Sequence, residues 1–251
     1  MKRPAVLRSE HMTADPSERY TMYDLEITGI RKSGIRTSTF SMRPESGIPF
    51  LPGQYVHLEA PGGPEYSKSR VRHMSIASSY HDDELLFSMT NDSGTEFKRI
   101  FNVLRPGSRV RMFKIRGEFT LANVPSGSNI VFIAGGIGIT PMRGIIRHIE
   151  QDSLDYSWSL IHVGNDFLYE EELSKYPTAQ IRIGRPQLPS VLNDTVAAIH
   201  KEEAERNYFM VSGSDAFVHS IVRSLILNGV HAVNILTENF TKKADRVSPV
   251  M

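Results

Sequence analysis

The strongest constraint in this chain is a continuous apolar segment that runs directly into a glycine-rich turn and then a helix. Residues Ile130–Ala134 read Ile-Val-Phe-Ile-Ala, which is typical of a strand buried on both faces of a sheet. The turn Gly135-Gly-Ile-Gly-Ile-Thr-Pro141 follows, with Pro141 in the first turn of a helix that ends near Ile149. A strand–turn–helix unit of this kind indicates a parallel sheet with crossover helices.

The same alternation continues to the C-terminus. Strands are predicted over Trp158–Val163, Tyr208–Ser212 and Ala232–Leu236, and helices from Tyr169 and over Asp215–Asn228. We therefore expect an α/β parallel-sheet nucleotide-binding domain over residues 126–251.

The first half of the chain reads differently, as short alternating strands separated by Gly and Pro. These strands are predicted over Tyr20–Ile27, Gly53–Glu59, Leu85–Thr90 and Arg109–Phe113, with one helix over Thr95–Leu104. The pattern is typical of an antiparallel barrel or sandwich, and we expect a β-barrel over residues 17–125. Residues 1–16 are polar and lack a hydrophobic period, so we expect a flexible N-terminal arm.

Composition excludes several classes of protein. Among 251 residues, 29 Lys and Arg balance 28 Asp and Glu, which leaves no charge excess for nucleic-acid binding. The absence of cysteine excludes disulfides and Cys-ligated metal or iron–sulfur centres, and the histidines show no metal-ligand spacing. The longest apolar run, Ile130–Met142, is shorter than the ~20 residues of a membrane span. We expect a cytoplasmic protein without a metal site.

Two segments carry candidate chemistry. The glycine turn ends at a helix N-terminus, where backbone N–H groups favour a phosphate, although neither a G-x-G-x-x-G pattern nor a P-loop lysine is present. The alternative is a tight turn without a ligand. In the second segment, Arg72 suits a diphosphate and Ser75 suits a ring nitrogen, and the alternative is a surface Arg and a strand Ser. In an extended strand the two side chains point to opposite faces, so one shared ligand requires a bend or a long molecule.

Together with their order along the chain, these segments resemble the ferredoxin–NAD(P) reductase superfamily of plant-type flavoproteins, in a short form without an iron–sulfur domain. The likeness covers roughly Tyr20 to Phe240. It rests on seven motifs, which are Pro52-Gly-Gln54, Arg72-x-x-Ser75, Phe97–Gly107, Gly117–Leu121, Gly135–Pro141, Val211–Gly213 and Glu238–Phe240.

The resemblance implies cofactors and site residues. Members bind FAD (a few use FMN) in the barrel and NADH or NADPH, as co-substrate, in the α/β domain, and hydride passes between nicotinamide C4 and flavin N5. The implied flavin-binding residues are Arg72, His73, Met74, Ser75, Met89, Thr90, Asn91, Phe97, Lys98 and Phe240. The implied dinucleotide-binding residues are Gly135, Gly136, Gly138, Thr140, Pro141, Ser212 and Gly213. The residues implied in catalysis are Ser75, Ser212 and Glu238.

Several positions depart from the family pattern. Met74 stands where an aromatic usually packs on the flavin, Ser212 replaces a Cys beside the nicotinamide, and Lys98 replaces a phosphate-binding Ser or Thr. The loop Gly164-Asn-Asp166 lacks the Arg that clamps a 2′-phosphate, and its Asp favours a free 2′-hydroxyl. We therefore expect a preference for NADH, which Arg182 and Arg185 on the next strand could reverse.

The expected function is an FAD-dependent NAD(P)H oxidoreductase. It would pass electrons through flavin to a separate acceptor such as ferredoxin or flavodoxin, or to a small molecule, since the chain has no cysteine for a cluster of its own. One alternative is an NAD(P)H:flavin reductase that uses flavin as a substrate, which Met74 favours. Another is a non-catalytic flavin-binding electron-transfer subunit. We expect His162, near the end of a buried strand, to be a core residue with satisfied hydrogen bonds rather than a ligand.

Overall fold

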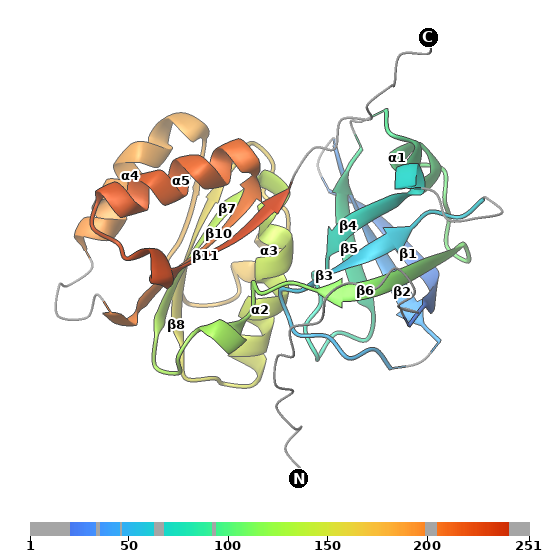
Figure 1. Ribbon diagram of the computed structural model, residues 1–251, viewed down its shortest axis with the longest axis horizontal. Coiled ribbons are helices and arrows are strands. Elements are labelled where there is room, and N and C mark those ends of the chain that lie inside the picture. Colours follow the sequence, from blue (N-terminus) through green and yellow to red (C-terminus); the bar gives the residue numbers. More distant parts are fainter. Residues whose placement is uncertain are drawn as a thin grey trace, which may run out of the picture.

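The computed structural model describes residues 21–33, 36–45, 47–62, 68–91, 94–198 and 205–240, which form two sheets lying side by side (Figure 1). The predicted arm over residues 1–16 lies outside this part of the chain. The strands of the first sheet fall within residues 23–116 and those of the second within 129–240, so the expected boundary after residue 125 falls between the sheets. No helix in the described ranges is long and apolar enough to span a membrane.

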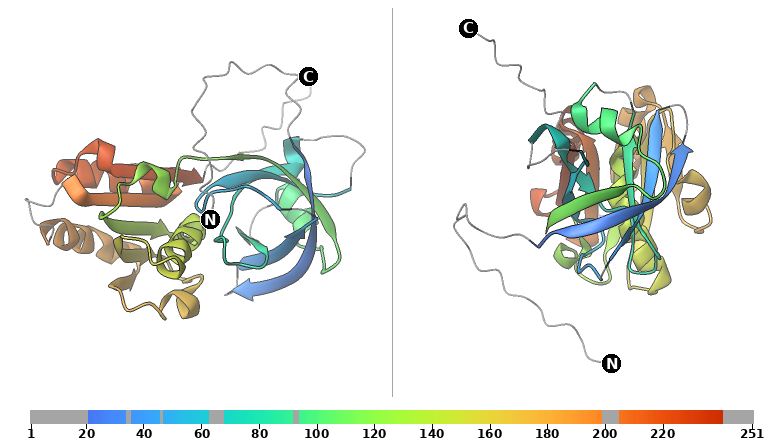
Figure 2. Two further views of the ribbon diagram at one scale, coloured as in Figure 1. Left: turned by 90° about the horizontal axis from the view of Figure 1, so that it is seen from below. Right: turned by 90° about the vertical axis from the view of Figure 1, so that its right-hand side faces the viewer.

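The first sheet is antiparallel and curls into a half-barrel (Figure 2). Its outer strands approach each other where the Ala77 N–H donates to the Leu86 carbonyl at 2.9 Å. The predicted antiparallel barrel is therefore confirmed. In spatial order its strands are β4 (Val71–Ser75), β3 (Tyr55–Glu59), β6 (Arg109–Arg116), β1 (Tyr23–Ser33), β2 (Thr37–Pro44) and β5 (Leu85–Thr90).

Alternation along these strands fills the barrel with apolar side chains. In β1, Leu25 and Ile27 are buried while Asp24 and Glu26 are exposed, as the period of two requires. Helix α1 (Glu96–Phe101) closes one opening of the barrel.

Two buried aromatic rings and an N-terminal cap stabilise helix α1. Its rings Phe97 and Phe101 are buried and stack with centroids 4.3 Å apart, and Thr95 caps the helix by accepting a hydrogen bond from the Lys98 N–H at 3.5 Å. The helix is shorter than the predicted Thr95–Leu104, because the chain leaves it through i→i−3 turns, in which the Val103 N–H donates to the Ile100 carbonyl at 3.1 Å and the Leu104 N–H to the Phe101 carbonyl at 3.3 Å.

The second sheet is parallel and carries helices on both faces. Its strands in spatial order are β11 (Ile235–Phe240), β10 (Asn207–Ser214), β7 (Asn129–Gly135), β8 (Ser157–Val163) and β9 (Gln180–Ile183). Helices α2 (Ile139–Gln151) and α3 (Glu170–Leu173) pack with Phe132 and Leu160 on one face. Helices α4 (Leu188–Ala197) and α5 (Asp215–Leu227) pack with Ile133 and Val211 on the other. The α/β prediction is therefore confirmed.

One predicted strand is misplaced. Residues 232–234 form a 3-10 turn, and the strand begins only at Ile235 instead of Ala232. The side-chain amide of Asn234 donates to the Asn207 carbonyl at 3.0 Å, and its backbone N–H donates to the His231 carbonyl at 3.0 Å. These bonds hold Asn234 in the turn and attach it to the first residue of β10. The apolar pattern of the segment therefore predicted the start of the strand three residues too early.

Helix α2 packs directly on the barrel segment that follows β4. A β-carbon at Gly144 would collide with the Ser78 carbonyl oxygen, so only glycine allows this approach. The approach also brings the 3-10 turn η3 (Gly136–Gly138), which precedes α2, into contact with β5. The two halves of the molecule thus meet where α2 begins.

A buried arginine joins the two halves chemically. The Arg143 side chain is 5% exposed, and its Nη1 donates to the Ala77 carbonyl at 2.8 Å. The same guanidinium pairs with Asp82 of the barrel half at 3.0 Å and with Glu172 of α3 at 2.7 Å. Burial alone would lower the pKa of Arg143, but its hydrogen bonds to the two carboxylates raise that pKa above the ordinary value.

The buried side chain of Tyr169 makes a second contact between the two halves of the molecule. Tyr169 has φ of 64°, an uncommon conformation for a residue other than glycine, and its ring is buried beneath the Arg143 guanidinium, 5.2 Å from centroid to Cζ. Its hydroxyl lies 2.6 Å from Ser88 Oγ, which in turn lies 2.7 Å from Thr39 Oγ1. The connection after β8 is thereby anchored inside the barrel strands β2 and β5.

We expect Arg143→Met to lower the free energy of unfolding by about 3 kcal/mol, because it removes a buried cation and leaves the partly buried Asp82 and Glu172 with Arg147 as their cationic partner. Arg43→Met is the matched control, since Arg43 is 66% exposed and its ion pair in the described part of the chain is with Glu84 at 2.9 Å, and its loss should cost less than about 1 kcal/mol. Urea unfolding measures both. Equal effects of the two substitutions would contradict the tie between the halves.

Candidate functional site

The glycine turn has one open position and two closed ones. Gly136 has φ of +55°, and a β-carbon there would meet no atom within 4 Å. A β-carbon at Gly138 would instead collide with the Ser212 carbonyl oxygen, and one at Gly135 would lie 2.7 Å from the Phe217 ring. Gly135 and Gly138 therefore permit close packing, whereas Gly136 is the glycine beside which a ligand has room.

The next residues form the inner scaffold of the turn. Thr140 is 2% exposed, and its hydroxyl donates to the Ile137 carbonyl at 2.7 Å. Pro141 is buried in the first turn of α2. The N–H groups that begin a helix have no partner within it, and they make its N-terminus favourable for an anion. Thr140 and Pro141 thus shape the turn, while its backbone offers the donors.

Three of the predicted residues meet at the carboxyl ends of β10 and β11. Ser212 of β10 lies beside Glu238 of β11 in the parallel register, and the Ser212 carbonyl lies directly against Gly138. Ser212 is fully buried, and its Oγ has no hydrogen-bond partner within the described ranges. A buried hydroxyl without a partner is costly, so this atom marks a place where a polar ligand atom fits.

The Glu238 carboxyl lies in an environment that disfavours its charge. Burial raises the pKa of Glu238 from 4.5 to about 7. The group therefore titrates near neutral pH, which suits a residue that holds or transfers a proton. Phe240, two residues on, is half-buried at the end of β11 and lies beside Ser214.

On the barrel side, two cations lie at the outer strands β4 and β5. Arg72 Nη1 donates to the Val71 carbonyl at 2.8 Å, and the guanidinium lies 5.9 Å from the centroid of the Phe97 ring. Lys98 Nζ donates to Thr90 Oγ1 of β5 at 2.8 Å. Helix α1 thus connects the predicted residues Arg72, Phe97, Lys98 and Thr90 into one group.

Strand alternation separates His73 from its neighbours in the motif. Arg72 and Met74 lie opposite Leu58 and Val56, whose side chains are fully buried in the barrel. The exposed His73 lies on the other face of β4, stacked on His57 with ring centroids 4.1 Å apart and on Tyr55 at 5.3 Å. By alternation Ser75 belongs to the same face as His73, so the Arg72 and Ser75 side chains leave β4 on opposite faces, as the sequence predicts.

The remaining flavin-side positions lie at the end of β5. Met89 is 3% exposed and belongs to the barrel core. The Asn91 amide nitrogen donates to Ser38 Oγ at 3.0 Å, and its Oδ1 is buried without a hydrogen-bond partner in the described part of the chain. Asn91 Oδ1, like Ser212 Oγ, is therefore a buried acceptor that a ligand would satisfy.

Strand β9, the third strand of the α/β sheet along the chain, bears on the choice of nucleotide. Arg182 of β9 is held by Ser174 at 2.8 Å and by Glu170, whose Oε1 lies 3.3 Å from Arg182 Nε. Arg185 lies beyond β9, in the 3-10 segment Arg185–Gln187. The acidic partner of Arg182 reduces its value as a ligand for a 2′-phosphate.

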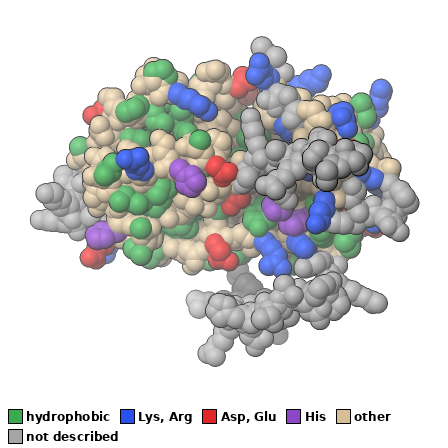
Figure 3. Space-filling view, turned by 45° about the horizontal axis from the view of Figure 1, so that its top comes forward, with side chains coloured by type: hydrophobic (Ala, Val, Ile, Leu, Met, Phe, Trp, Pro, Cys, Tyr) green, Lys and Arg blue, Asp and Glu red, His purple; other side chains and the backbone are tan. Residues whose placement is uncertain are grey.

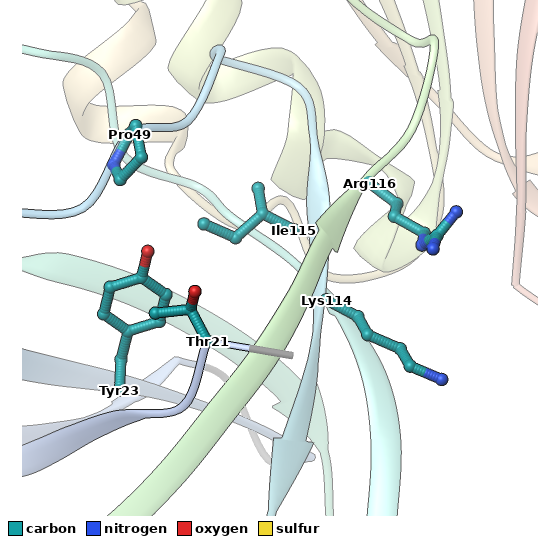
Figure 4. A pocket seen from close by; sticks show the side chains of 6 residues that line it. All are labelled: Thr21, Tyr23, Pro49, Lys114, Ile115 and Arg116. Atoms are coloured by element: carbon teal, nitrogen blue, oxygen red, sulfur yellow. The ribbon is translucent and has the colours of Figure 1, made fainter. Parts of the chain in front are cut away.

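One hollow described by the structure lies away from these residues. A cavity of about 380 Å³ beside β6 is lined by Thr21, Tyr23, Pro49, Lys114, Ile115 and Arg116, with the Lys114 and Arg116 side chains extending to one side (Figure 4). It contains none of the predicted site residues. In the described ranges no three His, Asp or Glu side chains lie close enough together to hold a metal ion.

Sequence reasoning missed Arg143 and Tyr169. The signal for Arg143 was available, because it stands within a stretch, Ile139–Ile146, that is otherwise free of charge on a helix next to the glycine turn. Tyr169 carried no such signal, since its left-handed backbone and its partners on β2 and β5 appear only in three dimensions.

Comparison with curated proteins finds reductases. No protein-family model matches the chain. The tetrachlorobenzoquinone reductase of Sphingobium chlorophenolicum is 27% identical over 158 residues, which are 61% of this chain and 47% of that protein. The cyanelle ferredoxin–NADP reductase of Cyanophora paradoxa is 28% identical over 189 residues, 66% of this chain and 52% of that protein. The chain thus spans about half the length of these relatives.

Comparison with solved structures finds the same architecture. The ferredoxin NADP+ reductase of Neisseria gonorrhoeae, solved with bound FAD and NADP, has a TM-score of 0.71 at 19% identity and covers 88% of this chain and 98% of its own. A barrel followed by a parallel α/β sheet is therefore common to this chain and that reductase. The resemblance carried by the sequence motifs is confirmed, because the chain shares the two-domain fold of a ferredoxin NADP+ reductase and is similar in sequence to curated reductases.

Proposed function

We propose that this chain is an FAD-dependent NAD(P)H oxidoreductase that passes electrons to a separate acceptor. One observation carries the proposal, namely that the open glycine turn, the buried Ser212 hydroxyl and the Glu238 carboxyl lie together where the α/β half meets the outer strands of the barrel. This is the place where a nucleotide on one half and a flavin on the other would meet.

The residues present fit both cofactors. The open Gly136 and the donors of the turn suit a dinucleotide diphosphate, and Ser212 Oγ and Asn91 Oδ1 are buried oxygens without a partner in the described ranges, which polar ligand atoms would satisfy. The Neisseria neighbour was solved with FAD and NADP, which supports the same pair here. When bound, the flavin supplies the redox chemistry, accepting two electrons from the nicotinamide.

The chain's own residues would bind and orient these groups. Arg72, steadied by the Val71 carbonyl, would hold the flavin diphosphate, with Lys98 and Thr90 beside it. Ser75 and Ser212 would contact the two reacting rings from opposite halves. Glu238 would hold a proton near them, since its pKa of about 7 leaves it partly protonated at neutral pH.

We further propose a preference for NADH. Asp166 follows the second strand, where an acid accepts the ribose 2′-hydroxyl and repels a 2′-phosphate. Arg182, the cation that could favour NADPH, is already paired with Glu170.

The acceptor is proposed to be a separate protein such as a ferredoxin or flavodoxin, or a small molecule. In the space-filling view, Lys and Arg side chains gather mainly over the barrel half of the face shown (Figure 3). A positive surface near the flavin half supports a negatively charged acceptor.

A flavin reductase that releases its flavin is the second candidate. Met74 favours it, because this half-buried side chain packs against the barrel core and offers no flat ring on which a flavin can stack. The difference between the two candidates is how long the flavin stays bound.

The first experiment is a visible spectrum of the purified protein, followed by anaerobic titration with NADH and NADPH in separate cuvettes. We expect flavin bands that bleach at lower concentrations of NADH than of NADPH. Better reduction by NADPH would contradict the nucleotide preference. Oxidation of NADH that needs added flavin and leaves none bound would favour the flavin reductase, and a protein that takes up no flavin would overturn both candidates.

We expect Arg72→Ala to weaken FAD binding by about tenfold, because a charged contact to the diphosphate is lost. The measurement is the flavin-to-protein ratio after gel filtration, with dissociation constants from fluorescence titration. Arg109→Ala is the control, since Arg109 is exposed and its 3.1 Å pair with Glu45 lies on the outer side of the barrel. Equal flavin content in all three proteins would remove Arg72 from the site.

Glu238→Gln should change both rate and pH dependence. Because the pKa of Glu238 is about 7 when folded and about 4.5 when unfolded, the folded state holds more protons between these values. The free energy of unfolding of the wild type should therefore fall as pH rises from about 4.5 to 7, by roughly 2 kcal/mol relative to the variant.

The same variant should slow flavin reduction by NADH severalfold in stopped flow while keeping its flavin content. Chemical unfolding of both proteins at pH 5 and pH 8 gives the stability arm. An identical pH dependence in wild type and Glu238→Gln, or an unchanged reduction rate, would remove Glu238 from its proposed role.

A further inference from the structure

The imidazole of His162 is bonded to the glycine turn. His162 lies in β8 beside Ala134 of β7, is 1% exposed, and has its Nε2 at 2.8 Å from the Gly136 carbonyl oxygen. A carbonyl oxygen can only accept, so Nε2 is the donor and carries the hydrogen. The same carbonyl also accepts the Ile139 N–H within the turn, so both of its lone pairs are used.

This bond fixes the most adaptable peptide of the turn. Gly136 has φ of +55°, and a β-carbon there would meet no atom within 4 Å, so no side-chain packing at this residue restricts the wide φ/ψ range of glycine. In a trans peptide the C=O and N–H point in opposite directions. Holding the Gly136 carbonyl toward β8 therefore turns the Ile137 N–H away from β8.

The imidazole itself is held in one orientation and one charge state. The Phe167 ring lies edge-on to it, with centroids 5.2 Å apart. Burial lowers the pKa of His162 to about 4, and the nearby Arg182 acts in the same direction. The ring is neutral at physiological pH, so it supplies a donor to the carbonyl without placing a charge beneath the turn.

We propose that His162 is a positioning residue for the nicotinamide dinucleotide, holding the Gly136–Ile137 peptide so that its N–H faces the diphosphate. The inference rests on the proposed dinucleotide site and adds a residue outside the glycine motif to it. His162 does not touch the ligand in this role. It acts through the Gly136 carbonyl, and its loss should affect dinucleotide binding more than flavin binding.

A near-isosteric pair of variants tests the bond. The Gln side-chain nitrogen matches His Nε2 in reach and keeps the donor, whereas Met has similar length and no donor. NAD+ and NADP+ are the probes, titrated calorimetrically into the FAD-loaded protein. We expect His162→Met to raise the dissociation constant of the dinucleotide that the wild type binds by about tenfold, and His162→Gln to stay within about threefold.

Hydrogen–deuterium exchange of the turn provides a readout that needs neither dinucleotide nor turnover. Amides of residues 136–140 should exchange several times faster in His162→Met than in wild type, and close to the wild-type rate in His162→Gln. Ile161→Val is the control for loss of packing on the same strand, because Ile161 belongs to the core on the opposite face of the sheet. It should leave both readouts unchanged.

If His162→Met does not fold, His162→Asn replaces it, since its shorter amide cannot reach the carbonyl and should give the same losses. A wild type that binds NAD+ or NADP+ together with a donor-free variant that binds equally well would overturn the inference and leave the proposed function standing. Failure of the wild type to bind either dinucleotide would overturn the proposed function and the inference with it.

Discussion

The structure depends on one buried cation that both halves of the molecule share. Arg143 projects from α2, which begins at the glycine turn, and its guanidinium joins Asp82 and the Ala77 carbonyl of the barrel half to Glu172 of α3. Because buried charge is stable only when fully paired, this group permits one relative placement of the two sheets. The glycine turn and the outer strands of the barrel thus meet in a fixed arrangement, and the candidate site lies at that junction.

The candidate site contains two kinds of polar group, namely buried oxygens without a hydrogen-bond partner in the described ranges and titratable side chains. Ser212 Oγ and Asn91 Oδ1 are buried and have no hydrogen-bond partner in the described ranges. A polar atom of a ligand that contacted either oxygen would therefore remove the cost of an unsatisfied buried group. Glu238 is the group in the site whose charge changes near neutral pH, whereas His162 remains neutral well below it. Proton exchange would therefore take place beside β11, while the glycine turn keeps the same hydrogen bonds across the physiological range.

Local patterns predicted most of the fold. The buried strand, the glycine turn and the amphipathic helices follow from short stretches of sequence, and they lie where the pattern predicted them. The strand over Ala232–Leu236 was wrong because an Asn234 contact to the start of β10 overrides local propensity. The residues that join the halves were not predictable in this way, since Arg143 and Asp82 are 61 positions apart and Tyr169 and Ser88 are 81 apart. By contrast, the opposite faces of Arg72 and His73 on β4 follow from strand alternation alone.

Gly144 has a consequence for how such a molecule tolerates change. Gly144 has no side chain, and a methyl group at its α-carbon would collide with the Ser78 carbonyl oxygen and would push α2 away from the barrel. A helix is stiff over this length, and it would carry the displacement back to the glycine turn at Ile139. Reacting atoms need to approach within about 3–3.5 Å, so a shift of one atomic layer would interrupt transfer while every ligand-binding side chain stayed intact. The contact at Gly144 thus sets the distance between α2 and the barrel, and in the proposed function it would set the separation of the two rings as well.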